Sequence, residues 1–258
     1  MRLGILGATG WLGQALGLGL ISKGLWPAER LVVLNRSGKV GGYAGHPVIW
    51  ARDAADLCVQ SDIVILSTRP EDFPPDGFDA GNRLVISFMT AWTLEKLAAR
   101  WPAARWVRAM PNGGASVGRS YTPWVAPGLA DEDAALVARL LSAMGDQDRV
   151  EDEGQLDYLS TLSGSGPAYP ALLARAMLRD AAARGLPEPV ARRAVEAVIC
   201  GSAALLEGRI GGLQEIIDAF LSYKGITAAG MAVAGPAFDQ AMQEALAAAS
   251  AKARDLSR

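Results

Sequence analysis

The chain has 258 residues, of which 50% are hydrophobic and 20% charged, and its formal net charge at pH 7 is -2. The length fits one large domain or two modest ones, at roughly 150 residues per domain, and the composition is that of a folded protein rather than a disordered one. No basic excess is present to neutralise a phosphate backbone, which excludes nucleic-acid binding as the main task.

Scarce residue types exclude further classes. A single histidine, His46, and two isolated cysteines, Cys58 and Cys200, leave no pattern for a metal site, so we predict none. Both cysteines are expected to be reduced core residues, which indicates a cytoplasmic protein. Every long apolar stretch is interrupted by charge or repeated glycine before it reaches about 18 residues, so we expect no membrane span.

Apolar runs and helical spacings alternate along the first 125 residues. Strands are expected at 2–6, 31–34, 62–67, 83–88 and 106–110, with helices at 11–23, 53–60 and 93–101. These strands lack the alternation of a half-exposed sheet, so each should be buried on both faces, and strand–helix–strand repetition implies parallel pairing. The pattern predicts an α/β fold with a Rossmann-type, doubly wound parallel sheet.

The pattern changes near Gly154. Beyond it only helices are expected, at 155–162, 168–184, 189–207, 213–220 and 227–255, with a glycine-rich break at 163–167. We therefore predict a dinucleotide-binding domain at 1–153 and an all-α domain at 154–258. A helix pair such as 168–184 and 189–207 needs a partner for its apolar face, and an interdomain contact or a dimer can supply one.

A glycine turn links the first strand to the first helix, where a Rossmann domain binds pyrophosphate. Glycine lets backbone N–H groups approach the phosphates, and the helix N-terminus adds positive potential. The spacing is G-x-x-G-x-x-G rather than G-x-G-x-x-G, but its place between strand and helix supports the assignment. The expected cofactor-binding residues of the turn are Gly7, Ala8, Thr9, Gly10, Trp11, Leu12 and Gly13.

The end of the second strand indicates which nicotinamide cofactor binds. An Asp or Glu there usually bonds the ribose 2′-hydroxyl of NAD, whereas this chain has Asn35, Arg36 and Ser37. No carboxylate repels a 2′-phosphate, and Arg36 can pair with one. NADP is therefore the expected cofactor, with NAD as the alternative.

The reaction class follows from missing acids. None of the tyrosines is followed by Lys four residues later, which excludes the Tyr-x-x-x-Lys pair of short-chain dehydrogenases. A reductase without an evident His, Lys or Tyr acid suits an electrophilic substrate such as a protonated cyclic imine.

Four motifs resemble the pyrroline-5-carboxylate reductases, and they follow the order of that family along nearly the whole chain. They are Asn35-Arg36, the D-I-V-I-L-S-T-R-P run at 62–70, V-R-A-M-P-N at 107–112 and S-G-S-G-P-A-Y at 163–169. The resemblance implies a Rossmann domain followed by a helical dimerisation domain, with the active site formed between them. It also implies a homodimer through the helical domain, or a larger homo-oligomer.

The resemblance assigns roles to further residues. It places along the cofactor, toward the nicotinamide, the residues Ser67, Thr68, Arg69, Pro70, Met110, Pro111 and Asn112. The family's substrate loop, S-P-G-G-T-T, corresponds to S-Y-K-G-I-T at 222–227. In the family this loop and the following helix N-terminus hold the substrate carboxylate, and its second threonine lies near the imine nitrogen. The expected substrate residues are Ser222, Lys224, Gly225, Ile226 and Thr227, with Thr227 as the catalytic residue.

The sequence thus predicts an NADPH-dependent reductase of a cyclic imino acid, with 1-pyrroline-5-carboxylate and L-proline as substrate and product. Two alternatives remain open because the loop has lost a proline, a glycine and a threonine. One is a paralogue acting on another cyclic imine, for which Lys224 could bind an added acidic group or point to solvent. The other is a non-catalytic NADP-binding protein.

Overall fold

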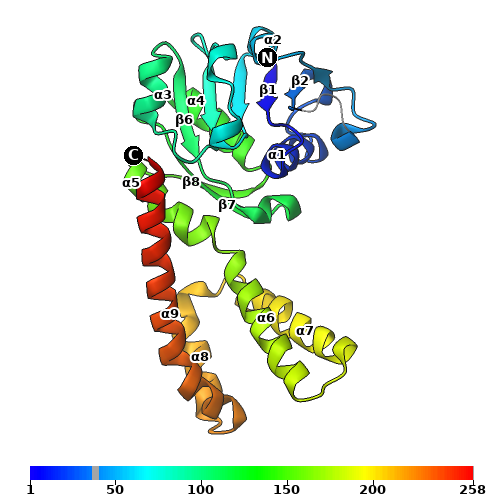
Figure 1. Ribbon diagram of the computed structural model, residues 1–258, viewed down its shortest axis with the longest axis vertical. Coiled ribbons are helices and arrows are strands. Elements are labelled where there is room, and N and C mark those ends of the chain that lie inside the picture. The colour runs from blue at the N-terminus through cyan, green and yellow to red at the C-terminus, as the bar shows by residue number, and fades with distance from the viewer. Residues whose placement is uncertain (37–40, 258) are drawn as a thin grey trace. The chain divides into compact units, whose positions relative to one another are not determined.

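The structure is a computed structural model that describes residues 1–36 and 41–257. Eight strands in this part of the chain form one sheet (Figure 1), in the order β3-β2-β1-β4-β5-β6-β7-β8. Their bounds are Leu3–Leu6 (β1), Leu31–Leu34 (β2), Ile49–Trp50 (β3), Ile63–Leu66 (β4), Leu84–Ser87 (β5), Arg105–Ala109 (β6), Ser120–Val125 (β7) and Gly145–Arg149 (β8).

The five predicted strands, β2, β1, β4, β5 and β6, pair in parallel, as expected, and the unpredicted two-residue strand β3 adds to β2 in the same direction. Every residue of β1, β4 and β5 is buried, which explains why these strands are apolar without alternation. Strand β1 pairs with β2 on one side and β4 on the other, so the chain reverses its direction of travel across the sheet there. In sheets of this kind the ligand crevice lies at that reversal, outside the carboxyl ends of the strands.

Strands β7 and β8 extend the sheet beyond the part that the sequence predicted. Strand β7 runs antiparallel to β6, and β8 runs parallel to β7. The sheet is therefore mixed rather than wholly parallel. Strand β8 reads G-D-Q-D-R and is mostly exposed, because it has a neighbour on one side only. Its polarity and the Pro123 within β7 explain why neither segment has the apolar signature of a strand.

Helices cover both faces of the sheet. Their bounds are Trp11–Ser22 (α1), Ala54–Gln60 (α2), Leu94–Arg100 (α3), Asp131–Leu141 (α4) and Glu153–Leu159 (α5). One apolar core contains Leu16 and Leu20 of α1 with Leu140 of α4, and the other contains Leu57 of α2 with Leu97 of α3. The separate cores show that α1 and α4 lie against one face and α2 and α3 against the other.

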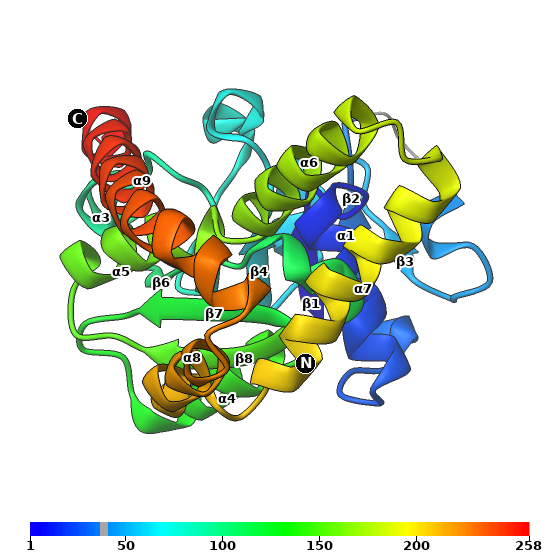
Figure 2. The ribbon, with the colours of Figure 1, turned by 90° about the horizontal axis from the view of Figure 1, so that it is seen from below.

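The C-terminal part is helical, as predicted. Its helices are Ala168–Ala183 (α6), Glu188–Leu206 (α7), Leu213–Ser222 (α8) and Ile226–Ser257 (α9). Helices α6 and α7 form an antiparallel hairpin, seen side by side in two views (Figures 1 and 2). Ahead of them a π-helical turn, Ser160–Gly164, continues α5 into the expected glycine-rich break.

Contacts divide the chain into two compact units. The first comprises residues 1–165 with the chain's last residues from Ser250 onward, and the second comprises residues 166–249. Cys58 is buried in the first unit, as expected, whereas Cys200 is exposed on α7 of the second. The expectation that Cys200 is a core residue is wrong, because an apolar helical sequence does not show which of its residues face a core.

Candidate active site

The glycine turn between β1 and α1 is closed to side chains at two positions. Gly7 has φ of +85°, and a Cβ there would lie 2.3 Å from the backbone oxygen of Ser67. A Cβ on Gly13 would lie 2.4 Å from the oxygen of Gly7. Real Cβ atoms do not approach so closely, so glycine is required at both ends of the turn, which supports the reading of a close-approach turn.

The turn is fixed to β2 and supported from behind. The amides of Gly7 and Ala8 donate to the carbonyl oxygen of Leu34, at 2.9 and 3.0 Å. The buried Tyr43 hydroxyl donates toward the carbonyl oxygens of Ala8 and Gly13, at 3.3 and 3.2 Å, and burial raises its pKa well above the ordinary value. Sequence reasoning missed Tyr43, because nothing local to residue 43 shows that it packs under a turn thirty residues away.

The N-terminus of α1 is open to an anion. Gly10 precedes the helix without a side-chain cap, and the first turn contains no acidic residue. The amides at the start of a helix have no acceptor within the helix, and the helix dipole adds positive potential there. The backbone of Trp11, Leu12 and Gly13 therefore presents donors of the kind that bind a pyrophosphate.

Asn35 lies at the carboxyl end of β2 beside the turn. Its amide Nδ2 donates to Thr9 Oγ1 at 2.9 Å, and this bond connects the strand end to the glycine turn. Its Oδ1 is buried without a hydrogen-bond partner among the residues described. A buried carbonyl oxygen normally accepts a hydrogen bond, so the hydroxyl group of a bound ligand could donate to Asn35 Oδ1.

Three arginines lie around the same strand end. Arg36 pairs with Asp72 at 2.6 Å and its side chain is 84% exposed, while Arg52 pairs with Asp56 at 3.4 Å. Arg69 follows Ser67 and Thr68 after β4. These cations lie where sequence reasoning expected a 2′-phosphate. Ser37, expected to share this role, lies outside the described residues.

A cleft of about 860 Å³ unites these groups. Eight of the sequence-predicted cofactor residues line it: Gly7, Thr9, Gly10, Asn35, Arg36, Ser67, Thr68 and Arg69. Asp53 also lines it, but its carboxylate accepts the amide of Asp56 at 2.8 Å as the N-cap of α2. Arg52 was not predicted, because a lone arginine ahead of a helix carries no motif. Ala8 is buried behind the turn. Pro70 begins the 3-10 turn Pro70–Asp72 and does not itself line the cleft, although Asp72 does.

Met110, Pro111 and Asn112 directly follow strand β6 and are all buried. None of them lines the cleft at the glycine turn. Asn112 is instead held on three sides: its amide donates to Ser120 Oγ, its Oδ1 accepts the amide of Gly114, and its Nδ2 donates to the carbonyl of Ser163. The segment is thus anchored both to β7 and to the π-helical turn after α5.

Arg108, two residues before this segment, joins β6 to α5. It is 1% exposed and forms ion pairs with Glu153 and, at 3.5 Å, with Asp157. Glu153 also accepts the backbone amide of Leu94 at the start of α3. Burial, together with the neighbouring Glu153, raises the pKa of the Asp157 carboxyl, against the lowering effect of Arg108.

The expected substrate loop connects α8 to α9 in the second unit. Ser222 Oγ donates to the carbonyl of Ala219 at 2.7 Å, which ends α8. Lys224 has φ of +47°, a left-handed conformation that favours glycine, the residue of the resembling family at this point. Ile226, at 94% exposed, and Thr227 begin α9, and the amide of Ala229 donates to the Gly225 oxygen at 3.1 Å. The loop thus offers an exposed helix N-terminus beside a flexible ammonium group.

No group of three or more His, Cys, Asp or Glu side chains among the described residues is arranged to hold a metal ion. No helix in this part of the chain combines the length and apolar character that crossing a bilayer requires.

Known proteins match the chain over almost all of its length. A family model described as "Pyrroline-5-carboxylate reductase dimerisation" matches residues 153–256. A pyrroline-5-carboxylate reductase from Thermus thermophilus is 30% identical over 262 residues, covering 99% of this chain and 98% of the relative. One from Haemophilus influenzae is 29% identical, covering 96% and 94%. The solved structure of a pyrroline-5-carboxylate reductase from Coxiella burnetii is 26% identical, with a TM-score of 0.87 over 100% of this chain and 98% of that one.

Proposed function

The chain belongs to the pyrroline-5-carboxylate reductase family, and we propose that it is an NADPH-dependent enzyme that reduces 1-pyrroline-5-carboxylate to L-proline. The observation that carries this proposal is the 30% identity to the Thermus enzyme, which extends over 99% of this chain and so includes both the glycine turn and the helical part. If the identity were confined to the dinucleotide-binding half, it would support cofactor binding but not the reaction or its substrate.

The cleft at the glycine turn fits the dinucleotide NADP. The backbone at Gly7 and Gly13 leaves no room for side chains, the start of α1 offers uncapped amides, and Asn35 Oδ1 lacks a partner. These groups would hold the pyrophosphate and the adenosine ribose. Arg36 and Arg69 would face a 2′-phosphate, which can compete with Asp72 for the exposed Arg36 because a phosphate carries more charge.

A hydride added to the carbon of the protonated imine gives a secondary amine, because the ring nitrogen already carries its proton and only receives the electron pair of the C=N bond. NADPH, when bound, would supply that hydride from C4 of its nicotinamide. Lys224 and the amides at the start of α9 hold the substrate carboxylate, and the Thr227 hydroxyl lies near the imine nitrogen. The exposure of this loop supports that assignment, because Tyr223 and Ile226 are 83% and 94% exposed in the isolated chain.

The protein is a homo-oligomer, and we propose a dimer through the helical unit as its basic form. Among residues 166–249, all of which are described, only Ala191 and Val195 are buried. Large apolar side chains such as Leu172, Val198 and Phe238 are 42–49% exposed there. A helical unit with so little core of its own needs a partner surface, and the matched dimerisation family supports a second copy. Reduced cysteines are consistent with the cytoplasm as the site of action.

The decisive experiment is a panel of imines with purified protein and NADPH. Five-membered and six-membered cyclic imino acids, with and without a second carboxylate, are compared by kcat/KM from NADPH oxidation. We expect 1-pyrroline-5-carboxylate to be the preferred substrate and proline to be formed in equal amount to the NADPH consumed. Negligible turnover of it beside strong turnover of another imine would contradict the substrate assignment while leaving the reaction class intact.

A further inference from the structure

Trp11 combines a large aromatic side chain with high exposure. It is the first residue of α1 and is 67% exposed, and it belongs to none of the apolar cores described above. Aromatic side chains contribute most to folding when buried, and a Trp left in water costs the protein that contribution. Trp11 directly follows Gly10, which lines the cofactor cleft, and its own side chain lines a neighbouring cavity of about 600 Å³ along α1. An exposed Trp next to the cofactor turn therefore suggests a contact with a ligand.

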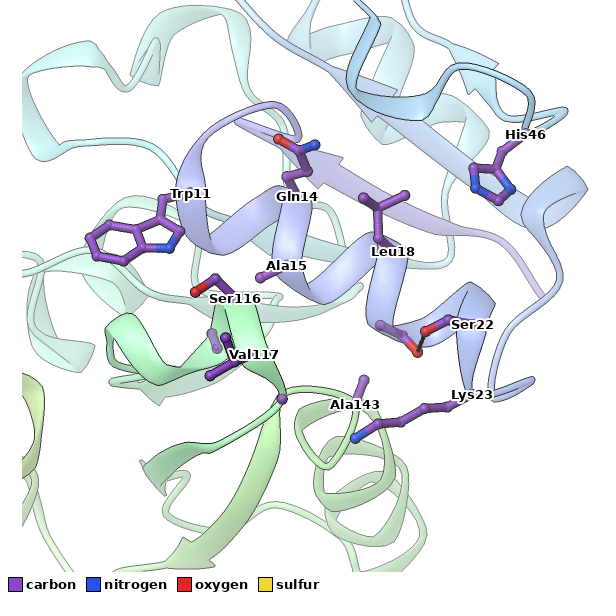
Figure 3. Close-up of a pocket in the computed structure, with 13 residues that line it drawn as sticks. Trp11, Gln14, Ala15, Leu18, Ser22, Lys23, His46, Ser116, Val117 and Ala143 are labelled. Atoms are coloured by element: carbon purple, nitrogen blue, oxygen red, sulfur yellow. Dashed lines mark hydrogen bonds between the residues drawn. The ribbon is translucent and has the colours of Figure 1, made fainter. Parts of the chain in front are cut away.

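The indole is held in a defined place. A Cβ added to Gly113 would lie 3.0 Å from the indole Cη2 and 3.1 Å from Cζ2, so the six-membered ring rests on the Gly113 backbone. Gly113 opens the 3-10 turn Gly113–Val117 (η5), whose start is fixed by Asn112 Oδ1. Figure 3 shows the ring projecting from the start of α1 on the side away from His46, near the turn that carries Ser116 and Val117.

This direction is toward the nicotinamide half of the cofactor. The adenosine end is assigned to the end of β2, at Asn35 and Arg36, and the pyrophosphate to the start of α1. A dinucleotide that crosses the strand reversal must therefore extend its nicotinamide toward β4, β5 and β6. Turn η5 directly follows β6 and Asn112, so an indole resting on Gly113 lies on that side.

We propose that Trp11 forms one wall of the space beside the nicotinamide in the first unit and contacts the apolar face of the substrate ring there. This inference rests on the proposed function and adds a specificity residue to it. An indole offers a flat, rigid surface that favours the methylene groups of a compact ring over an open chain or a polar substituent. Because Trp11 is anchored on Gly113 rather than on the substrate, the wall exists before substrate binds.

The test compares Trp11→Phe, Trp11→Leu and Trp11→Ala in the full-length protein. Exposure at position 11 makes misfolding of these variants unexpected, and Trp11→Phe keeps an aromatic ring if the smaller residues disturb α1. For the imine that wild type reduces best, we expect Trp11→Ala to raise KM about tenfold. The Kd for NADPH should change less than this KM, because the pyrophosphate is assigned to the backbone amide at position 11, which the substitution keeps. Trp11→Phe should restore most of the loss. An unchanged KM in an active Trp11→Ala enzyme would overturn the proposal, and so would a defect confined to NADPH binding.

A fluorescence experiment tests whether Trp11 lies near the bound nicotinamide and does not require the enzyme to turn over. Indole emission overlaps the absorption of a reduced nicotinamide, so bound NADPH quenches nearby tryptophans. Trp26→Phe is the matched control, because Trp26 is 6% exposed and follows the opposite end of α1. We expect Trp11→Phe to remove more of the NADPH-induced quenching than Trp26→Phe does, and an equal or smaller loss would contradict the placement. If wild type reduces no imine, the proposed function fails and this experiment alone judges Trp11.

Discussion

Gly7 is the residue at which the cofactor turn tolerates change least. Its φ of +85° disfavours a side chain, and a Cβ would also lie 2.3 Å from the Ser67 oxygen. The backbone term alone costs roughly 1–2 kcal/mol, and the clash adds to it by forcing β1 and β4 apart. We predict that Gly7→Ala lowers the free energy of unfolding by more than about 2 kcal/mol and raises the Kd for NADPH more than tenfold. Urea denaturation and calorimetric titration measure the two effects.

Gly45 provides a control for the backbone term. Its φ is +83°, nearly that of Gly7, but a Cβ there would meet nothing within 4 Å. Gly45→Ala should therefore cost only the conformational term, about 1 kcal/mol, and leave NADPH binding unchanged. Equal effects of the two substitutions would show that the contact with Ser67 is unimportant.

Arg36 is the residue whose charge should distinguish the two nicotinamide cofactors. A 2′-phosphate would replace Asp72 as its partner, and NADH has no such group. We predict that Arg36→Ala raises KM for NADPH about tenfold and changes KM for NADH by less than about twofold. Arg100→Ala is the matched control, since Arg100 also pairs with an exposed aspartate, Asp76, at 2.6 Å but lies outside the cleft. Parallel losses with both cofactors would argue against a 2′-phosphate contact.

At the scale of elements, local apolar pattern was sufficient for some parts of the fold and insufficient for others. Strands β1, β4 and β5 are buried on both faces, so their sequences alone identify them. The edge strand β8 is polar because water covers much of it, and nothing in G-D-Q-D-R indicates pairing with β7. The sequence predicted the parallel part of the sheet for this reason, but not its antiparallel extension.

Some residues of the candidate site could likewise be identified from sequence and others could not. Gly7, Gly13 and Arg36 belong to a turn and a strand end that are contiguous in sequence, so motif and spacing identify them. Tyr43 acts through partners about thirty residues away, and such contacts leave no local signature. Arg108 belongs to the V-R-A-M-P-N motif, but the motif does not reveal Glu153 and Asp157 as its partners. The Lys224 backbone conformation, by contrast, could be anticipated from the glycine that the family has there.

Helix α5 is joined to β6 by the cluster of Arg108, Glu153 and Asp157, which gives it a pH-dependent stability. Because burial raises the pKa of Asp157, the folded protein holds this proton more tightly than the unfolded chain does. The resulting stabilisation is complete below the unfolded pKa, about 4, and is lost as pH rises through the raised value. We predict that the unfolding free energy of wild type, relative to Asp157→Asn, falls as pH increases from about 4 through the raised pKa.

Asp180 serves as the control, because the stability that it contributes should change with pH in the opposite direction. Its hydrogen bond and ion pair with Arg184 lower the pKa of this exposed carboxylate, so its contribution is present above the unfolded pKa and lost as pH falls. Wild type relative to Asp180→Asn should therefore gain stability as pH increases from about 3 to 5. Denaturant titrations at several pH values measure both differences, and slopes of the same sign would contradict the assignment for Asp157.

At the scale of the whole molecule, the two units differ in how they are stabilised. The first buries its sheet between two helical layers, whereas the second leaves apolar side chains exposed along α6, α7 and α9. A monomer would expose this surface to water, at about 25 cal/mol for each Å² of apolar area left uncovered. Stability of the second unit should therefore depend on protein concentration, as it does when folding and association are coupled.

Val233 on α9 and Val59 on α2 allow this dependence to be tested at equal exposure, because both side chains are 78% exposed. A charge at a dimer interface loses its hydration on association, whereas a charge on a free surface does not. We predict that Val233→Asp weakens self-association at least tenfold, with a lower and more concentration-dependent Tm, and that Val59→Asp changes neither. Sedimentation equilibrium and thermal melts over a hundredfold range of concentration measure the two quantities. A Val233→Asp protein that stays as fully associated as Val59→Asp would place the interface elsewhere on the helical unit.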